Sequence, residues 1–186
     1  KRLMDSGALY FVAILPPKSL SEEIQKIRYD FRDRYDSRHA LKSPPHITLL
    51  SPFRAQSGAE KEIVKSLAEV TDSMYPFRIR LNNYASFPPR VIFIDVKRSN
   101  ELGRIQEMLE NKARIQSHVF NYNYDRRPFH PHLTIAFKDL SLENFQRSWD
   151  EFKNKVFEAE FMADRLTLLK HTGEIWQPVA DIRLTK

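Results

Sequence analysis

The sequence has no cysteine among its 186 residues. Disulfide bonds, thiolate metal sites and cysteine nucleophiles are therefore excluded. The absence of cysteine is compatible with a reducing compartment, and we expect a cytoplasmic location. Because the chain opens with Lys1 rather than Met, a targeting segment upstream of it stays an open alternative.

Glycine and long apolar runs are also scarce. The four glycines, Gly7, Gly58, Gly103 and Gly173, are scattered, which excludes a glycine-rich phosphate-binding loop. The serines lack the glycine-flanked turn that exposes the nucleophile of many hydrolases. No apolar stretch approaches the roughly 20 residues that a membrane-spanning helix needs, so we expect no membrane partner.

What the sequence does contain is typical of a folded domain. Hydrophobic residues make up 41% of the chain, including 13 Phe and 7 Tyr, and charged residues make up 29%. This balance favours a soluble protein with a substantial interior over a disordered chain. The net charge of +6 suits an anionic partner but does not identify one.

Strand and helix patterns alternate along the chain. Apolar spacing of three or four residues predicts four helices, the first opened by Ser19 with Glu22 and the second by Ser57 with Glu60. Short apolar or alternating runs predict the strands. These runs lie at residues 9–15, 47–50, 77–81, 91–96, 133–137, 156–161, 165–170 and 176–184.

The order of the predicted elements occurs twice, at about residues 9–87 and 91–186. Each copy reads strand, helix, strand with a Pro-His-x-Thr motif, helix and returning strands. A duplication of this kind relates two equivalent strands by a pseudo-twofold axis, so that both motifs face one cleft. No Gly or Ser linker separates the copies, and we expect a single bilobal domain over residues 1–186.

The two motifs are Pro-His-Ile-Thr at residues 45–48 and Pro-His-Leu-Thr at residues 131–134. In a strand, side chains two residues apart share a face. His46 and Thr48 are therefore expected on one face, as are His132 and Thr134. The apolar residues between and after them are expected to turn the other way into a core: Ile47 and Leu49, or Leu133, Ile135 and Phe137. A single motif of this kind is common, but two copies at equivalent places in a repeat are a specific signal.

Two histidines beside two threonines can perform acid–base chemistry. The ordinary pKa of histidine is near 6.5, so one ring of the pair can be neutral and the other charged near neutrality. One ring would deprotonate an attacking water while the other protonates a leaving ribose oxygen, as phosphodiester cleavage requires. Thr48 and Thr134 would donate hydrogen bonds to the phosphate oxygens. We expect neither a metal nor a cofactor.

The segment before the second motif supplies further candidates for substrate binding. Arg126 and Arg127 could contact phosphate and Phe129 could stack a base, although a solvated loop explains the same residues. His130 shares a strand face with His132, which gives at most two metal ligands. We therefore expect His130 to support His132 or to line the cleft wall.

With these residues in place, the chain resembles the 2H phosphoesterase superfamily, specifically the 2'-5' RNA ligase-like proteins or RNA 2',3'-cyclic phosphodiesterases. The resemblance is carried by the strand at residues 10–14 and by the motif segments at 45–49 and 130–136. It implies an α+β bilobal fold with two antiparallel sheets around a central V-shaped cleft and helices on the outside. It also implies the acid–base pair His46 and His132, with Thr48 and Thr134 as phosphate ligands.

The activity that the resemblance implies is metal-independent opening of a 2',3'-cyclic phosphate to a 2'-phosphate, with reversible 2'-5' ligation in some members. The partners are then RNA ends with a cyclic phosphate or small cyclic nucleotides, and we expect a monomer. Several members have an Arg shortly after the second motif, where this chain has Phe137 and Lys138. Lys138, or the pair Arg126 and Arg127, could supply that cation.

Two other classes of function stay open. A non-catalytic RNA- or nucleotide-binding module would use the same cleft with the histidines as ligands. A structural protein would keep the motifs without using them. Catalysis predicts a bell-shaped dependence on pH, whereas binding alone predicts a shallow one.

Overall fold

The computed structural model describes residues 7–124 and 127–186. The elements are β1 (Ala8–Ile14), α1 (Lys18–Tyr35), the 3₁₀ helix η1 (His39–Lys42), β2 (Ile47–Ala55), α2 (Glu60–Thr71), β3 (Phe77–Phe87), β4 (Val91–Val96), α3 (Asn100–Ile115), β5 (His132–Ala136), α4 (Leu142–Phe152), β6 (Glu158–Ala163), β7 (Arg165–His171) and β8 (Trp176–Arg183). Across these two ranges, none of the helices is long and apolar enough to cross a bilayer.

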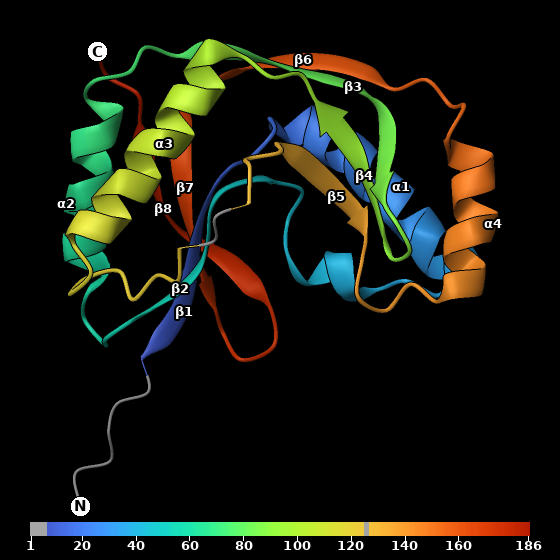
Figure 1. Ribbon diagram of the computed structural model, residues 1–186, viewed down its shortest axis with the longest axis horizontal. Helices are drawn as coiled ribbons and strands as arrows, with labels where there is room; N and C mark the ends of the chain where they lie inside the picture. The colour runs from blue at the N-terminus through green and yellow to red at the C-terminus, as the bar shows by residue number, and fades with distance from the viewer. Residues whose placement is uncertain (1–6, 125–126) are drawn as a thin grey trace, which may run out of the picture.

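The strands form one antiparallel sheet in the order β6-β3-β4-β5-β2-β1-β7-β8 (Figure 1). Its two halves meet at the centre, where β2 pairs with β5 at Ile47 and Leu133. The α+β class with antiparallel strands is therefore confirmed. The two predicted sheets are hydrogen-bonded to each other through this joint, and they are the halves of a single curled sheet.

The helices cover the outside of the two halves (Figure 1). Helices α2 and α3 pack against each other over the half that contains β1, β2, β7 and β8. Helices α1 and α4 lie over the other half, where α1 packs on β5. Because β3 pairs with β4, and β7 pairs with β1, the predicted repeats 9–87 and 91–186 do not coincide with these halves.

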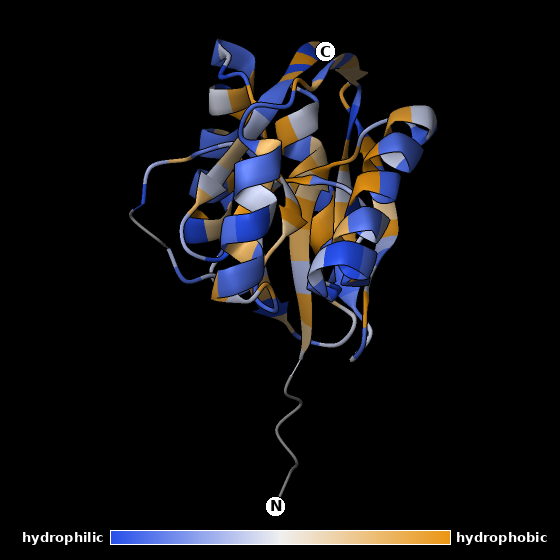
Figure 2. Cartoon of the chain, turned by 90° about the vertical axis from the view of Figure 1, so that its right-hand side faces the viewer, coloured by the Kyte–Doolittle hydropathy of each residue, from blue (hydrophilic) through white to orange (hydrophobic). Residues whose placement is uncertain are grey.

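Alternation along the two central strands places the core and the site on opposite faces. Ile47 and Leu49 of β2 and Leu133 and Ile135 of β5 are buried, as predicted. Each such side chain stabilises the fold by about 1.5–3 kcal/mol through burial. Figure 2 shows the same division for the helices, which turn hydrophobic residues toward the sheet and hydrophilic residues outward.

The predicted starts of the first two helices are wrong. Helix α1 begins at Lys18 after the cap residue Pro17, and α2 begins at Glu60 after Ala59, with no side-chain cap bond in either case. Ser19 therefore lies inside the first turn of α1, where its hydroxyl is not the cap. The side chains that do cap helices are Ser99 on α3 and Ser141 on α4.

Candidate active site

The register of β2 and β5 places the two motifs crosswise. One step to either side of the central pair in this antiparallel register, His46 lies opposite Thr134 and Thr48 lies opposite His132. All four side chains are partly exposed. In the ranges that the structure describes, neither threonine hydroxyl has a hydrogen-bond partner within the protein, and a ligand could therefore occupy both.

The two histidine rings are anchored in the same way. Nδ1 of His46 lies 2.7 Å from the carbonyl oxygen of Pro44, and Nδ1 of His132 lies 2.6 Å from that of His130. A carbonyl oxygen can only accept, so Nδ1 carries the proton in the neutral ring. The lone pair is then on Nε2, which is the atom that can take up or release a proton in the cleft.

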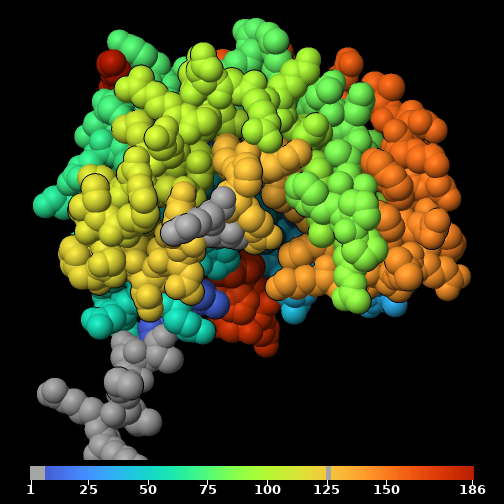
Figure 3. All heavy atoms as spheres, in the orientation of Figure 1, coloured from blue at the N-terminus to red at the C-terminus, as the bar shows by residue number. Residues whose placement is uncertain are grey.

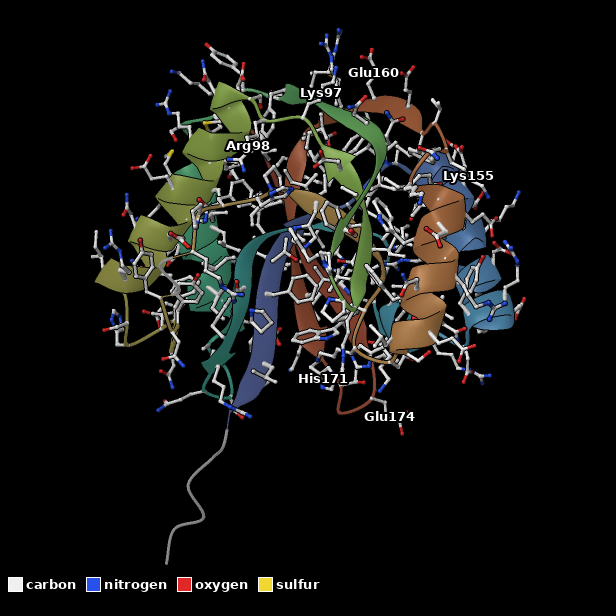
Figure 4. The ribbon with its side chains drawn as sticks, turned by 45° about the vertical axis from the view of Figure 1, so that its right-hand side comes forward. Lys97, Arg98, Lys155, Glu160, His171 and Glu174 are labelled. Atoms are coloured by element: carbon white, nitrogen blue, oxygen red, sulfur yellow. The ribbon has the colours of Figure 1, made fainter. Side chains whose placement is uncertain are left out.

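Aromatic rings adjoin His46 on the side of β1. The Phe11 ring centroid lies 4.8 Å from that of His46, and the Trp176 ring lies 4.8 Å from Phe11. His171 follows at 4.8 Å from Trp176, at the end of the β7–β8 hairpin that Figure 4 marks with His171 and Glu174. This row of rings leads from the cleft to the surface.

A corresponding arrangement adjoins His132. Phe93 of β4 and Phe87 of β3 have ring centroids 5.2 Å and 5.3 Å from that of His132. His130 packs on the same two rings, and its Nε2 lies 3.4 Å from a carboxylate oxygen of Asp95. Asp95 is also the cross-strand partner of His132.

Figure 3 shows a recess bounded by the green β3–β4 hairpin, the gold residues that lead into β5 and the red β7–β8 hairpin. Phe87 and Trp176, which belong to the rows of rings beside the two histidines, come from these two hairpins. The sequence analysis did not single out Phe11 or Phe93. The signal that could have found them is that they occupy equivalent strands, β1 and β4, beside the two motifs.

The environment lowers the pKa of both histidines. Burial is the main cause for His46, and with the charges of Arg28 and His132 it lowers the pKa to about 4, against the bond to Pro44. Burial also lowers the pKa of His132, and the charge of His130 adds to this effect. The negative charge of Asp95 acts in the opposite direction on His132.

Arg28 is a site residue that the sequence analysis missed. Its side chain is 1% exposed, and it lies behind the motif strands. Nε and Nη2 donate to the carbonyl oxygen of Thr134 at 3.2 Å and 3.0 Å, and Nη1 donates to that of Ser43 at 2.7 Å. The guanidinium therefore ties the second motif to the segment just before the first.

A signal for Arg28 was present in the sequence. The buried residues of α1 are Leu20, Ile24, Arg28, Phe31 and Tyr35. Arg28 lies between Ile24 and Phe31 on the buried stripe of α1, at a helical position that an apolar residue would usually occupy. An arginine at such a position has to find buried acceptors.

Among the other predicted site residues that the structure describes, His130 is in contact with one of the two histidines. His130 lies beside His132, and Phe129 is partly buried against the core. Arg127 is exposed in the loop before β5, and Arg126 lies outside the described residues. Lys138 is exposed beyond the end of β5, with its ammonium 5.5 Å from the Phe137 ring centroid.

Among residues 7–124 and 127–186, no three His, Asp or Glu side chains are grouped so that they could hold a metal ion. His130 and Asp95 form an isolated pair. That the reaction needs no metal stays a prediction.

Comparison with known proteins identifies relatives over most of the chain. A family model described as the 2'-5' RNA ligase superfamily matches residues 16–174. A protein of Oceanobacillus iheyensis named "Putative phosphoesterase OB1230" is 30% identical over 162 residues, which cover 86% of this chain and 88% of the relative. A protein of Geobacillus kaustophilus with the same kind of name, GK0864, is 32% identical over 162 residues, covering 86% of each.

Solved structures share the fold. TT0787 of Thermus thermophilus has a TM-score of 0.69 at 18% identity, covering 95% of this chain and 98% of that one. LigT of E. coli, solved in complex with 3'-AMP, has a TM-score of 0.59 at 21% identity, covering 96% and 99%. At these identities the likeness concerns the fold alone.

Proposed function

This chain belongs to the 2'-5' RNA ligase superfamily, and we propose that it is a phosphodiesterase that opens 2',3'-cyclic phosphates on RNA ends or nucleotides to 2'-phosphates. The observation that carries the proposal is the crosswise pair of histidines, each with Nδ1 bound to a carbonyl and Nε2 left for the cleft. The names of the bacterial relatives support phosphoester chemistry.

The different surroundings of the two rings assign their roles. His46 has the more strongly lowered pKa, so its neutral ring acts as the general base. Its Nε2 takes a proton from water while the water oxygen forms a bond to phosphorus. The bond from phosphorus to the ribose 3'-oxygen breaks, and that oxygen receives the proton of Nε2 of His132. Asp95 favours the protonated form of His132 that this step requires.

Thr48 and Thr134 stabilise the charge that develops on the non-bridging oxygens. Each threonine lies opposite the histidine of the other motif, so a phosphate between the rings would be within reach of both hydroxyls. Removal of one such donor typically costs about 10²–10³ in turnover. With the 5'-hydroxyl of a second RNA in place of water, the same two proton transfers would form a 2'-5' linkage as the bond from phosphorus to the 3'-oxygen breaks.

The substrate class follows from the rims of the cleft. Trp176 and Phe87 present aromatic surface from two opposing hairpins, and every nucleobase can stack on such a surface. The structure of LigT with 3'-AMP shows a nucleotide bound by a protein of this fold. We therefore propose nucleotides with a cyclic phosphate, free or at an RNA end, with Arg127 in the loop beside the second motif as a phosphate contact.

The test is hydrolysis of nucleoside 2',3'-cyclic monophosphates and of a short RNA with a cyclic end, in EDTA. His46→Ala and His132→Ala are each expected to lower turnover by at least about 10²-fold. His118→Ala, at an exposed histidine, serves as the matched control. Release of a 2'-phosphate that depends on both histidines supports the proposal, and a mutant with near-wild-type turnover overturns it.

A non-catalytic binding module is the second candidate, because the lowered pKa values leave both rings largely neutral at pH 7. Two neutral rings can bind a ligand, but they lack the proton that the leaving oxygen needs. Retained nucleotide binding with no turnover on any cyclic phosphate, at any pH between 4 and 8, would favour this candidate.

A further inference from the structure

We infer that Arg28 is the positioning residue of this site: its buried guanidinium holds the two motif strands in register and places a positive charge behind His46. The geometry places the guanidinium directly behind the site. Its fork binds the carbonyl oxygen of Thr134, the residue opposite His46 in the strand register. Its third contact, with Ser43, lies three residues before His46.

In the part of the chain that the structure describes, Arg28 has no counter-charge, because no carboxylate there lies within 4.0 Å of its guanidinium. Its remaining partner is the amide oxygen of Gln25, 3.5 Å from Nη1. Burial accordingly lowers the pKa of Arg28 to about 10, which still leaves it charged at neutral pH.

A buried cation without an ion pair is costly for folding, since its desolvation is repaid only by hydrogen bonds to neutral acceptors. An apolar residue at this position of α1 would continue the stripe formed by Ile24 and Phe31. The positive charge of Arg28 is therefore better explained by a role in the site than by a contribution to packing in the core. An anion between the histidines would supply the counter-charge that the fold leaves out.

Burial is the largest effect that lowers the pKa of His46, and two nearby charges add to it. The cation of Arg28 approaches from α1 and the ring of His132 from β5, and both disfavour a second positive charge. Phe11 on β1 contributes an uncharged ring. Removal of the Arg28 charge should therefore make His46 easier to protonate.

The experiment is a pH titration of the histidine ring signals by NMR on the intact chain, with inorganic phosphate as the binding probe. Arg28→Gln is expected to raise the midpoint of His46 by about one pH unit, which is a tenfold change in proton affinity. Phosphate should bind about tenfold more weakly. Arg28→Lys, which keeps the charge but not the fork, should leave the His46 midpoint low while kcat falls.

Arg32→Gln is the matched control, because Arg32 lies one turn further along α1 and is exposed. If Arg28→Gln does not fold, Arg28→Met fills the space without a charge and gives the same comparison. An unchanged His46 midpoint in the uncharged variant, or a full rise in Arg28→Lys, overturns the inference.

The effect on kcat rests on the proposed function, whereas the titration and phosphate binding do not. A wild-type protein without turnover whose His46 midpoint still rises in Arg28→Gln would refute the proposed function and support the role of Arg28. Turnover in the wild type, together with a His46 midpoint that does not change in Arg28→Gln, would support the proposed function and refute the role of Arg28.

Discussion

The two histidines of the cleft share one backbone setting but have different electrostatic surroundings. Each begins or precedes a central strand, donates Nδ1–H to the carbonyl two residues earlier and rests against a Phe of the neighbouring strand. For His46 that ring is Phe11, and for His132 it is Phe93. The local geometry is therefore close to symmetric.

The charges break this symmetry. A buried cation, Arg28, acts on His46 from behind, whereas a carboxylate, Asp95, pairs across the strands with His132. A single proton shared by the two rings would thus reside on His132. The comparison teaches that two copies of one motif can differ in proton affinity because of the charges around them, without any difference in the motif itself.

The largest expected effect comes from breaking the aromatic support on each side. Phe11→Ala and Phe93→Ala should each lower the free energy of unfolding by about 3–5 kcal/mol, because both rings are buried and their loss leaves a cavity. Urea unfolding measures this change. Tyr75→Ala, at a ring that is 63% exposed, should cost less than about 0.5 kcal/mol. A decrease in the free energy of unfolding for only one of the two variants would show that Phe11 and Phe93 do not support their histidines equally.

The next largest effect is expected at Thr48 and Thr134, the two proposed phosphate contacts, and it tests whether they contribute equally. Thr48→Val and Thr134→Val should each lower kcat by about 10²-fold, because a hydrogen-bond donor to the developing charge is lost. Thr→Ser at either position should restore most of the activity. Steady-state kinetics on a nucleoside cyclic phosphate distinguish this result from a loss at one threonine alone, which would contradict the crosswise arrangement.

The pH profile tests the electrostatic difference directly. The acid limb of the profile follows the general base His46, so activity should fall on that side only as the pH drops toward about 4. The alkaline limb follows the general acid His132, whose pKa lies below the ordinary value of 6.5, so activity should already fall before the pH reaches neutrality. By pH 7.5 we expect a loss of at least about tenfold from the optimum. An optimum above pH 7 in kcat/KM would contradict this assignment.

The smallest expected effect sharpens the comparison at His132. Asp95→Asn removes the negative charge that raises the pKa of His132, so the alkaline limb should move to lower pH. We expect a shift of about half a unit, or a threefold change, because Asp95 is partly exposed. The acid limb, which follows His46, serves as the internal control. A shift of both limbs together would assign the effect to the fold instead.

The sequence was sufficient for features that depend on local periodicity. The alternation around His46 and His132 predicted which side chains enter the core, and the strand and helix order was predicted well. The burial of Arg28 was not, because its acceptors come from β5 and from the segment before β2, far from α1 in the chain. The start of α1 was missed because Pro17 and Lys18 begin the helix before Ser19 is reached.

The membership of each half of the sheet depends on long-range pairing in the same way. Pairing between strands distant in sequence decides that β3 lies with β4 and that β7 lies beside β1. Those pairings depend on the packing of the whole sheet, which no local pattern contains.

The pairing of β1 with β7, which joins Phe11 to Leu169, has a consequence for biosynthesis. A nascent chain that has emerged as far as Ala163 already contains both histidine motifs, yet β1 still has an open edge and Trp176 does not yet cover Phe11. An uncovered edge strand is prone to pair with other chains. We therefore expect a stage on the ribosome at which both histidine motifs are present but the first strand is unprotected. This interval ends only when residues 165–183 have been made.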